Sequence, residues 1–158
     1  MPNRAVVITV SDRCAAGAQR DESGPAIIDA LPALESQLVH REIVADDVDA
    51  IRDRVTAWLG RAELILLTGG TGVAERDVTP DAIEPLLERR LPGFGEVMRL
   101  EAFKRTPLSI VSRSGGGIAR KTLIVWLPGS PRGARECVQW LAPAIRHVCG
   151  FLRGETPH

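Results

Sequence analysis

The sequence predicts an α/β domain in which helices cover both faces of a mostly parallel sheet. Three runs of nearly continuous Val, Ile and Leu have the pattern of strands buried on both faces: Arg4–Val10, Glu63–Thr68 and Thr122–Leu127. Segments with helical spacing of apolar residues separate these runs, and this order is typical of a three-layer sandwich. A chain of 158 residues suits one such domain, expected over residues 1–153, with a frayed tail at 154–158.

Shorter patterns predict the next elements of the sheet and its helices. Residues Leu38–Val44 alternate between apolar and polar, which predicts a fourth strand nearer an edge of the sheet. The helix expected over residues 48–59 has apolar residues at helical spacing, and Asp47 stands where its N-cap should be. Thr79 is expected to cap the following helix, with Pro80 at the first helical position.

The second half of the chain contains most of the remaining helical patterns. Helices are predicted at Gly93–Lys104, Arg132–Leu141 and Pro143–Leu152. Pro32 and Pro85 also fall inside helical patterns, where proline costs about 3 kcal/mol because it lacks an N–H group and clashes with the preceding turn. A kink or a helix boundary is therefore expected at both prolines.

Composition excludes several classes of function. Twenty basic residues balance twenty acidic ones, so the formal net charge is zero and a nucleic acid is not expected as partner. The three cysteines have neither an even count nor metal-type spacing, which indicates inert thiols and neither a disulfide framework nor a zinc site. No apolar run approaches the roughly 20 residues of a membrane span, and the N-terminal run is too short for a signal peptide. We therefore expect a cytoplasmic protein without a membrane partner.

Polar and glycine-rich segments follow the predicted strands. In open α/β sheets, ligands bind at the carboxyl ends of parallel strands, so these segments are expected to converge at one edge. Another polar and flexible segment, Ser112–Gly117, precedes the last strand. The segments that follow strands are Ser11–Arg13, Asp46–Asp47, Thr68–Gly72 and Pro128–Pro131.

The segment after the second apolar run is a glycine-rich turn made of Thr68, Gly69, Gly70, Thr71 and Gly72. Three glycines allow backbone N–H groups to surround an anion, and two threonines add hydroxyl donors. The turn is neither a Walker loop nor a dinucleotide-binding fingerprint, because the residues that define those motifs are absent. The alternative is a tight turn that only reverses the chain.

Two aspartates near this turn are candidates for a metal site. Asp77 lies just beyond the turn, where a carboxylate beside a phosphate is favourable if Mg²⁺ lies between them. The alternative is that Asp77 interacts with the dipole of the helix that follows, although Asp81 fits that role better. Asp47 is explained as a helix cap, which leaves Asp46 as the second candidate carboxylate.

Other donors suited to phosphate come from the remaining loops. Ser112 and Ser130 offer hydroxyl groups, and an arginine such as Arg76 or Arg113 can bind phosphate through two parallel hydrogen bonds. The alternative for either arginine is a solvated surface residue. No arrangement of Ser, His and Asp or of Cys and His stands out, so the residues favour phosphate chemistry that depends on a metal and on positioning.

Several motifs in the same order resemble the molybdopterin adenylyltransferase family, the MogA and MoaB group. The resemblance covers almost the whole chain and is therefore more specific than a single glycine turn. The matching segments are Ser11–Arg13, Leu66–Gly72, Arg76–Ala82, Pro92–Glu96, Ser112–Arg113 and Leu127–Pro131.

The resemblance implies a fold, a reaction and a set of site residues. The fold is that of a molybdopterin-binding domain, and the terminal phosphate of molybdopterin attacks the α-phosphorus of ATP with Mg²⁺, releasing pyrophosphate. Asp46 and Asp77 correspond to the two important aspartates of the family as catalytic and metal-binding residues. Substrate contacts are expected at the glycine turn and also at Ser112, Arg113, Gly129 and Ser130.

The resemblance also implies partners and leaves an alternative open. A homotrimer is expected, together with an interaction with the molybdenum-insertion protein of the same pathway. The alternative function is a non-catalytic protein that binds or carries molybdopterin. Molybdenum insertion itself belongs to much larger multidomain proteins, and the length of this chain argues against it.

Overall fold

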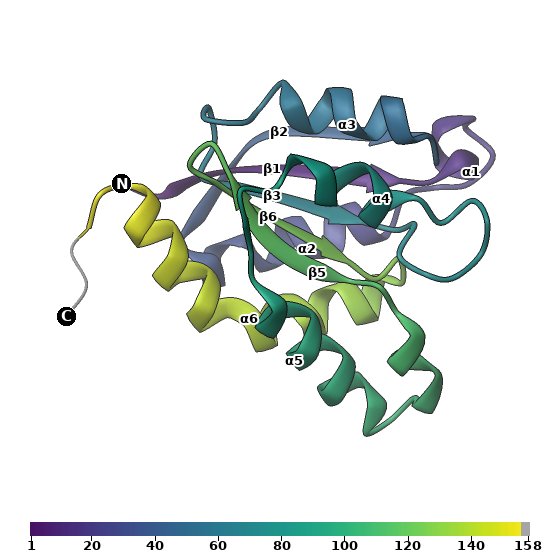
Figure 1. Ribbon diagram of the computed structural model, residues 1–158. Coiled ribbons are helices and arrows are strands. Elements are labelled where there is room, and N and C mark those ends of the chain that lie inside the picture. The colour runs from purple at the N-terminus through teal and green to yellow at the C-terminus, as the bar shows by residue number, and fades with distance from the viewer. Residues whose placement is uncertain (156–158) are drawn as a thin grey trace.

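The computed structural model describes residues 1–155 and shows a mixed six-stranded sheet with helices on both faces (Figure 1). The order of the strands is β2-β1-β3-β6-β5-β4, which confirms the predicted α/β class. The first four strands in this order are parallel, and the last two are antiparallel to their neighbours. The strands are β1 (Asn3–Val10), β2 (Ser36–Val44), β3 (Leu64–Thr68), β4 (Arg89–Arg90), β5 (Gly115–Ala119) and β6 (Thr122–Leu127).

Two hydrophobic cores lie on the two faces of the sheet, as the continuous apolar strands predicted. In β1, Ala5 and Val7 enter one core while Val6 and Ile8 enter the other, because successive strand residues point to opposite faces. The first core lies under α2 (Ser23–Ala30), α5 (Pro92–Phe103) and α6 (Pro131–Leu152). The second lies under α3 (Val48–Thr56) and α4 (Thr79–Ile83). One sheet with a core on each face supports our proposal of a single domain.

Strand β5 differs from the prediction of a flexible segment at Ser112–Gly117. A Cβ atom on Gly115 would lie 2.6 Å from the ring of Trp126, and one on Gly116 would lie 2.8 Å from the ring of Phe94. The glycines therefore make room for two aromatic side chains while their backbone pairs with β6. Glycine has a low strand propensity, and tertiary packing overrides it here.

Helix α6 also differs from the prediction, because a single helix contains both segments that were expected to be separate. Pro143 lies inside it without ending it. The helix buries a continuous apolar stripe at helical spacing on both sides of the proline, and this burial outweighs the missing hydrogen bond. The stripe comprises Ala134, Cys137, Val138, Leu141, Ala142, Ile145 and Cys149.

The two other prolines mark helix boundaries, as predicted. Pro32 lies in the 3₁₀ helix η1 (Leu31–Leu34), which follows α2, and Pro85 lies in η2 (Glu84–Leu86), which follows α4. Asp47 caps α3 as predicted, because its carboxylate accepts a hydrogen bond of 2.8 Å from the N–H of Ala50. Two further short helices are α1 (Asp12–Ala15) and η3 (Pro107–Val111).

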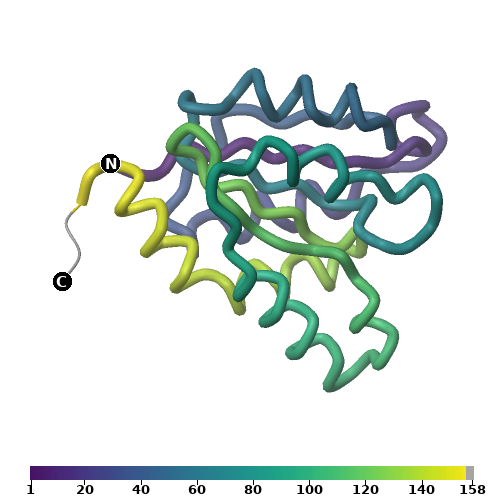
Figure 2. Tube along the Cα trace, viewed as in Figure 1, coloured from purple at the N-terminus to yellow at the C-terminus, as the bar shows by residue number. Residues whose placement is uncertain are grey.

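The two ends of the described chain lie on the same side of the molecule (Figure 2). Arg153, at the end of α6, donates a hydrogen bond to the side chain of Asn3 in β1. Of the tail expected to fray, Glu155 donates its N–H to the carbonyl of Gly150, and residues 156–158 lie outside the described part. Within residues 1–155, the helices are too short or too polar to span a bilayer.

Candidate functional site

A cavity of about 300 Å³ lies at the carboxyl ends of the parallel strands. The end of β1 and the segment that follows it, residues 9–23, contribute most of the polar side chains, and the loops after β2, β3 and β6 contribute Asp46, Asp77 and glycines. The topology thus brings together segments that are far apart in sequence, as the rule for parallel sheets predicted. The residues singled out from sequence that line this cavity are Asp46, Thr68, Gly69, Gly70, Asp77 and Gly129.

The glycine turn has a backbone that requires glycine at two positions. Gly69 and Gly70 have φ angles of +103° and +66°, in the region that side chains disfavour. A Cβ atom on Gly69 would lie 2.2 Å from the carbonyl oxygen of Val10 at the end of β1. The turn is therefore packed tightly between neighbouring strands, and glycine is needed for the fold as well as for any ligand.

Thr79 forms hydrogen bonds to the carbonyls of the glycine turn. It does not cap α4 as predicted, because the N-cap position is occupied by Val78. The hydroxyl of Thr79 donates to the carbonyl of Gly69 at 2.8 Å, and its N–H donates to the carbonyl of Gly70 at 3.1 Å. With these carbonyls occupied, the N–H groups of Gly70, Thr71 and Gly72 have no acceptor among residues 1–155. Of these three residues Gly70 lines the cavity, so its N–H is the donor of the turn that is nearest to a ligand there.

Asp46 is joined to Asp12 by a pair of reciprocal hydrogen bonds. The N–H of Asp12 donates to Oδ2 of Asp46, and the N–H of Asp46 donates to Oδ1 of Asp12, both at 2.9 Å. Arg76 adds a bond of 2.6 Å to Oδ2 of Asp12 and one of 3.3 Å to the carbonyl of Asp46. These contacts fix the loop after β2 while Oδ1 of Asp46 receives no hydrogen bond from the described residues.

The electrostatic surroundings of Asp46 disfavour its charged form. Burial raises the pKa of its carboxyl above the ordinary value, and the nearby carboxylates of Asp12 and Asp77 raise it further. Hydrogen bonding from Asp12 and the positive charge of Arg76 offset only part of this effect. A cation in the cavity would therefore stabilise a carboxylate that the protein itself leaves poorly compensated.

Asp77 projects into the same cavity from the loop before α4. Its Oδ2 accepts a hydrogen bond of 3.0 Å from the N–H of Ala74. A Cβ atom on Gly72 would lie 2.7 Å from this oxygen, so the carboxylate rests against the glycine turn. No Lys or Arg side chain among residues 1–155 forms an ion pair with Asp77, and its negative charge is left to the cavity.

The two candidate ligands, Asp46 and Asp77, fit Mg²⁺ better than a metal whose ligands all come from protein side chains. Within residues 1–155, no group of three or more His, Cys, Asp or Glu side chains could hold a metal ion. Mg²⁺ commonly takes one or two carboxylates and completes its octahedron with phosphate oxygens and water. Asp46 and Asp77 provide this kind of partial oxygen site.

Other predicted substrate contacts lie outside this cavity. Ser112 and Arg113 line a second cavity of about 600 Å³ beside α5. Ser130 caps α6, where its hydroxyl accepts a hydrogen bond of 3.0 Å from the N–H of Gly133. Thr71 is buried, and Gly72 accepts a hydrogen bond from the guanidinium of Arg113. The structure thus separates the predicted set into groups that line different surfaces.

Comparison with known proteins identifies the family. The family model described as "Probable molybdopterin binding domain" matches residues 6–147. The chain belongs to this family. A molybdopterin adenylyltransferase of Helicobacter pylori (strain J99) is 40% identical over 152 residues, which cover 94% of this chain and 86% of that protein. Molybdenum cofactor biosynthesis protein B of Escherichia coli (strain K12) is 38% identical over 138 residues, covering 85% and 80%.

Solved structures share the fold of this molybdopterin-binding domain. The molybdopterin biosynthesis enzyme MoaB of Thermus thermophilus superposes with a TM-score of 0.90 at 37% identity, covering 97% of this chain and 98% of that one. The molybdopterin biosynthesis Mog protein of Mycobacterium ulcerans has a TM-score of 0.89 at 31% identity, covering 98% and 99%. These matches confirm the resemblance inferred from the sequence motifs.

One residue of the molybdopterin-binding domain that the sequence did not single out is Asp21. Its buried carboxylate lines the first cavity and accepts hydrogen bonds from the hydroxyl of Thr9 at 2.8 Å, the N–H of Gly24 at 3.0 Å and Arg41 at 3.0 Å. The signal in the sequence was the polar run Arg20–Ser23, directly before an apolar helical pattern.

Two of the three thiols of this domain, Cys137 and Cys149, are buried in the hydrophobic core. Burial raises the pKa of both Cys137 and Cys149 to about 12, so they stay protonated at neutral pH, as expected of inert thiols. Cys14 lines the first cavity and is half-buried, and all three cysteines are free.

Proposed function

We propose that this protein transfers AMP from ATP to the terminal phosphate of molybdopterin, with Mg²⁺ as cofactor and pyrophosphate as the second product. The observation that carries the proposal is the meeting of Asp46 and Asp77, from separate loops, in one cavity beside a glycine turn with unused N–H donors. The name of the Helicobacter pylori relative, a molybdopterin adenylyltransferase, supports the same reaction.

The residues of the chain have distinct tasks in this proposal. Asp46 and Asp77 would hold Mg²⁺, which when bound offsets negative charge on the phosphates and polarises the phosphorus under attack. The N–H group of Gly70, which lines the cavity, would orient a phosphate oxygen without adding a charge, and Thr71 and Gly72 are proposed to contact the substrate at the rim of the turn. Thr68 and Gly129 complete the wall of this cavity, and Ser112 and Ser130 are proposed to contact the remainder of the substrates.

We also propose that the protein is a homotrimer and that it meets the molybdenum-insertion protein of the pathway. An exposed apolar surface on α5 and η3 supports the first of these proposals. Exposed fractions reach 60% for Leu100, 78% for Leu108 and 51% for Ile110. Light scattering should give a trimer mass at micromolar concentration, and Leu108→Glu should lower that mass if this surface is the interface.

An assay with purified protein, molybdopterin, ATP and Mg²⁺ tests the catalytic proposal. The expected result is pyrophosphate release that requires both molybdopterin and Mg²⁺, with one adenylylated molybdopterin for each pyrophosphate. Binding of molybdopterin without pyrophosphate release, under conditions in which an active relative turns over, would instead identify a non-catalytic molybdopterin-binding protein.

A further inference from the structure

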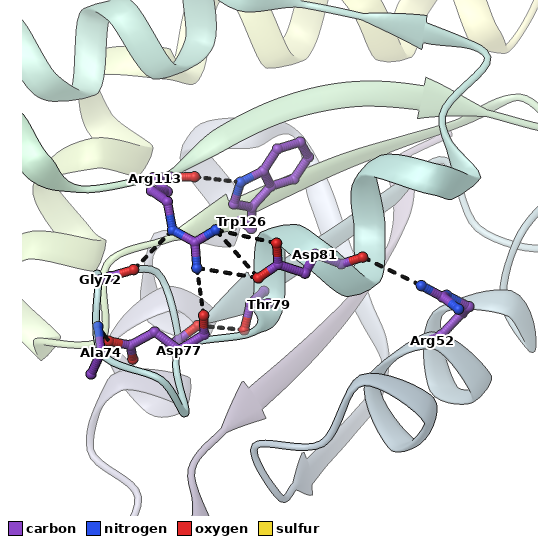
Figure 3. A network of polar contacts seen from close by, with 9 residues as sticks. Arg52, Gly72, Ala74, Asp77, Thr79, Asp81, Arg113 and Trp126 are labelled. Atoms are coloured by element: carbon purple, nitrogen blue, oxygen red, sulfur yellow. Dashed lines mark hydrogen bonds and ion pairs between the residues drawn. The ribbon is translucent and has the colours of Figure 1, made fainter.

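Arg113 forms a network with the segment that carries Asp77 (Figure 3). Its Nε donates to the carbonyl of Gly72 at 2.9 Å, and its Nη2 donates to the carbonyl of Asp77. Its Nη1 and Nη2 both lie 3.3 Å from Oδ2 of Asp81, with which Arg113 forms an ion pair. One guanidinium therefore joins both ends of the loop between Gly72 and Asp77 to the first turn of α4.

The backbone of Arg113, just before β5, is held at both its N–H and its carbonyl. Its N–H donates to the carbonyl of Thr71 at 2.7 Å. Its carbonyl accepts a hydrogen bond of 2.8 Å from Nε1 of Trp126 (Figure 3). Trp126 lies in β6 and is only 3% exposed. The guanidinium thus extends from a backbone position that is fixed by two hydrogen bonds.

Besides Arg113, Arg76 ties this loop to the rest of the protein, because it pairs with Asp12 and donates to the carbonyl of Asp46. Residues 73–76 are exposed, and the hydrogen bond from the N–H of Ala74 to the carboxylate of Asp77 lies within the loop itself. The direction of the Asp77 carboxylate therefore depends on the two ends of the loop, which Arg113 holds, and on the contacts of Arg76. Arg52 supports the far side, because its Nη2 donates to the carbonyl of Asp81 at 3.3 Å (Figure 3).

Counting hydrogen-bond donors argues against a direct contact between Arg113 and a phosphate. A guanidinium has five N–H groups. The one on Nε and both on Nη2 are directed at Gly72, Asp77 and Asp81, and Nη1 also faces Asp81. At most one N–H group, on Nη1, remains for a phosphate, so bidentate binding would have to displace the carboxylate of Asp81, which already offsets the charge of the guanidinium.

We propose that Arg113 is a positioning residue that sets the direction of the Asp77 carboxylate and does not bind phosphate itself. This inference rests on the proposed function, in which Asp77 holds Mg²⁺. Arginine is required because its planar fork reaches three acceptors at once, whereas the single ammonium of lysine cannot reproduce this geometry. We call the contacts of Arg113 with Gly72, Asp77 and Asp81 the clamp. The carboxylate of Asp81 completes it, because the ion pair keeps the guanidinium directed toward the loop.

The first test needs neither metal nor substrate. Hydrogen exchange of peptides that cover residues 72–81 should be about tenfold faster in Arg113→Lys than in the wild type, since one or two hydrogen bonds of the segment are lost. Arg4→Lys is the matched control. Arg4 pairs with Glu63 at the amino ends of β1 and β3, far from this segment, and its substitution should leave the exchange of residues 72–81 unchanged. Unchanged exchange in Arg113→Lys would overturn the proposal.

The second test separates positioning from phosphate binding by kinetics. In Arg113→Lys, kcat should fall about 10–100-fold while KM for ATP and for molybdopterin changes little, because geometry is lost and no substrate contact is removed. Asp81→Asn should move kcat in the same direction, and the double variant should lose less than the product of the two single effects. A rise in KM for Arg113→Lys with Asp81→Asn unchanged or improved would show that Arg113 binds phosphate.

Asp77→Asn in the same assays shows whether a negative result contradicts the proposed function or only the positioning role of Arg113. If Asp77→Asn keeps normal turnover, the proposed function of Asp77 is wrong. If Asp77→Asn loses turnover while Arg113→Lys and Asp81→Asn retain it, the metal assignment stands and the positioning role is wrong. Should Arg113→Lys fold poorly by circular dichroism, Asp81→Asn carries both tests, because it weakens the same clamp from an exposed side chain.

Discussion

Asp21 and Asp46 line the same cavity, yet their surroundings are opposite. Asp21 accepts hydrogen bonds from Thr9, Gly24 and Arg41, and these outweigh the effect of burial, so its pKa lies below the ordinary value. The pKa of Asp46 is raised by burial and by neighbouring carboxylates. We call the side of the cavity at Asp21 the first wall and the side at Asp46 and Asp77 the second wall. The protein compensates the negative charge of the first wall and leaves that of the second wall to a ligand.

This difference shows how to separate structural from functional carboxylates in one cavity. A carboxylate with several donors from its own chain stabilises the fold and has little capacity left for a metal. A carboxylate held in place but poorly compensated costs stability, which is typical of functional sites. Substitutions on the two walls should therefore have opposite consequences.

The largest expected effect is on catalysis at the second wall. Asp46→Asn and Asp77→Asn should each lower kcat about 10²–10³-fold, or 3–4 kcal/mol, because a fixed charge beside the phosphates is lost. Pyrophosphate release measures this change, and Tm should not fall. Asp47→Asn is the control, since Asp47 caps α3 and turnover should stay near normal. Normal turnover in Asp77→Asn would make the binding-protein alternative the better one.

The next largest effect concerns stability at the first wall. Asp21→Asn should lower the free energy of unfolding by about 2–3 kcal/mol, because an amide N–H₂ would face the donors Thr9 and Arg41. Urea denaturation measures the loss, and Asp29→Asn, on an exposed side chain of α2, should change stability by less than about 0.5 kcal/mol. Equal effects of both variants would contradict the structural role of Asp21.

Gly69 lies where the glycine turn meets the end of β1, and it should tolerate substitution poorly. Gly69→Ala should cost at least about 1–3 kcal/mol in the free energy of unfolding, because of its positive φ and the approach of Val10. Gly93→Ala is the control: its Cβ would meet no atom within 4 Å and α5 has no positive φ there, so stability should rise slightly. Thermal denaturation of both variants would show whether the turn is as tight as described.

The smallest effect concerns the pH dependence of Asp46. A pKa raised in the folded state means that stability is lost as pH rises through the range between the unfolded and folded values. Asp46→Asn should therefore have a higher Tm than the wild type at pH 7, and thermal denaturation at decreasing pH should show this difference disappear as Asp46 becomes protonated in both states. Asp21 has the opposite sign, since its contribution is present at neutral pH and is lost as pH falls through its lowered pKa.

Much of the fold and part of the site could be predicted from local patterns. Continuous apolar runs identified the parallel strands, and the rule that ligands bind at their carboxyl ends placed Asp46, Asp77 and the glycine turn together. Strand β5 was missed because its glycines oppose strand formation locally and are required by distant residues, namely Trp126, Phe94 and Leu87. The division of α6 at Pro143 was wrong because burial on both sides of the proline outweighs its local cost.

The sequence by itself determined which residue types gather at the carboxyl ends of the parallel strands. The order of the elements along the chain and the polarity of each can be predicted from short segments. Only the tertiary structure decided which of these groups are already occupied. Thr79 was predicted to cap a helix, but its hydroxyl donates a hydrogen bond to the carbonyl of Gly69. Arg113 donates a hydrogen bond to the carbonyl of Gly72, which lies 41 positions earlier in the chain. A hydrogen bond between distant segments depends on how whole elements pack, and local propensity carries no information about it.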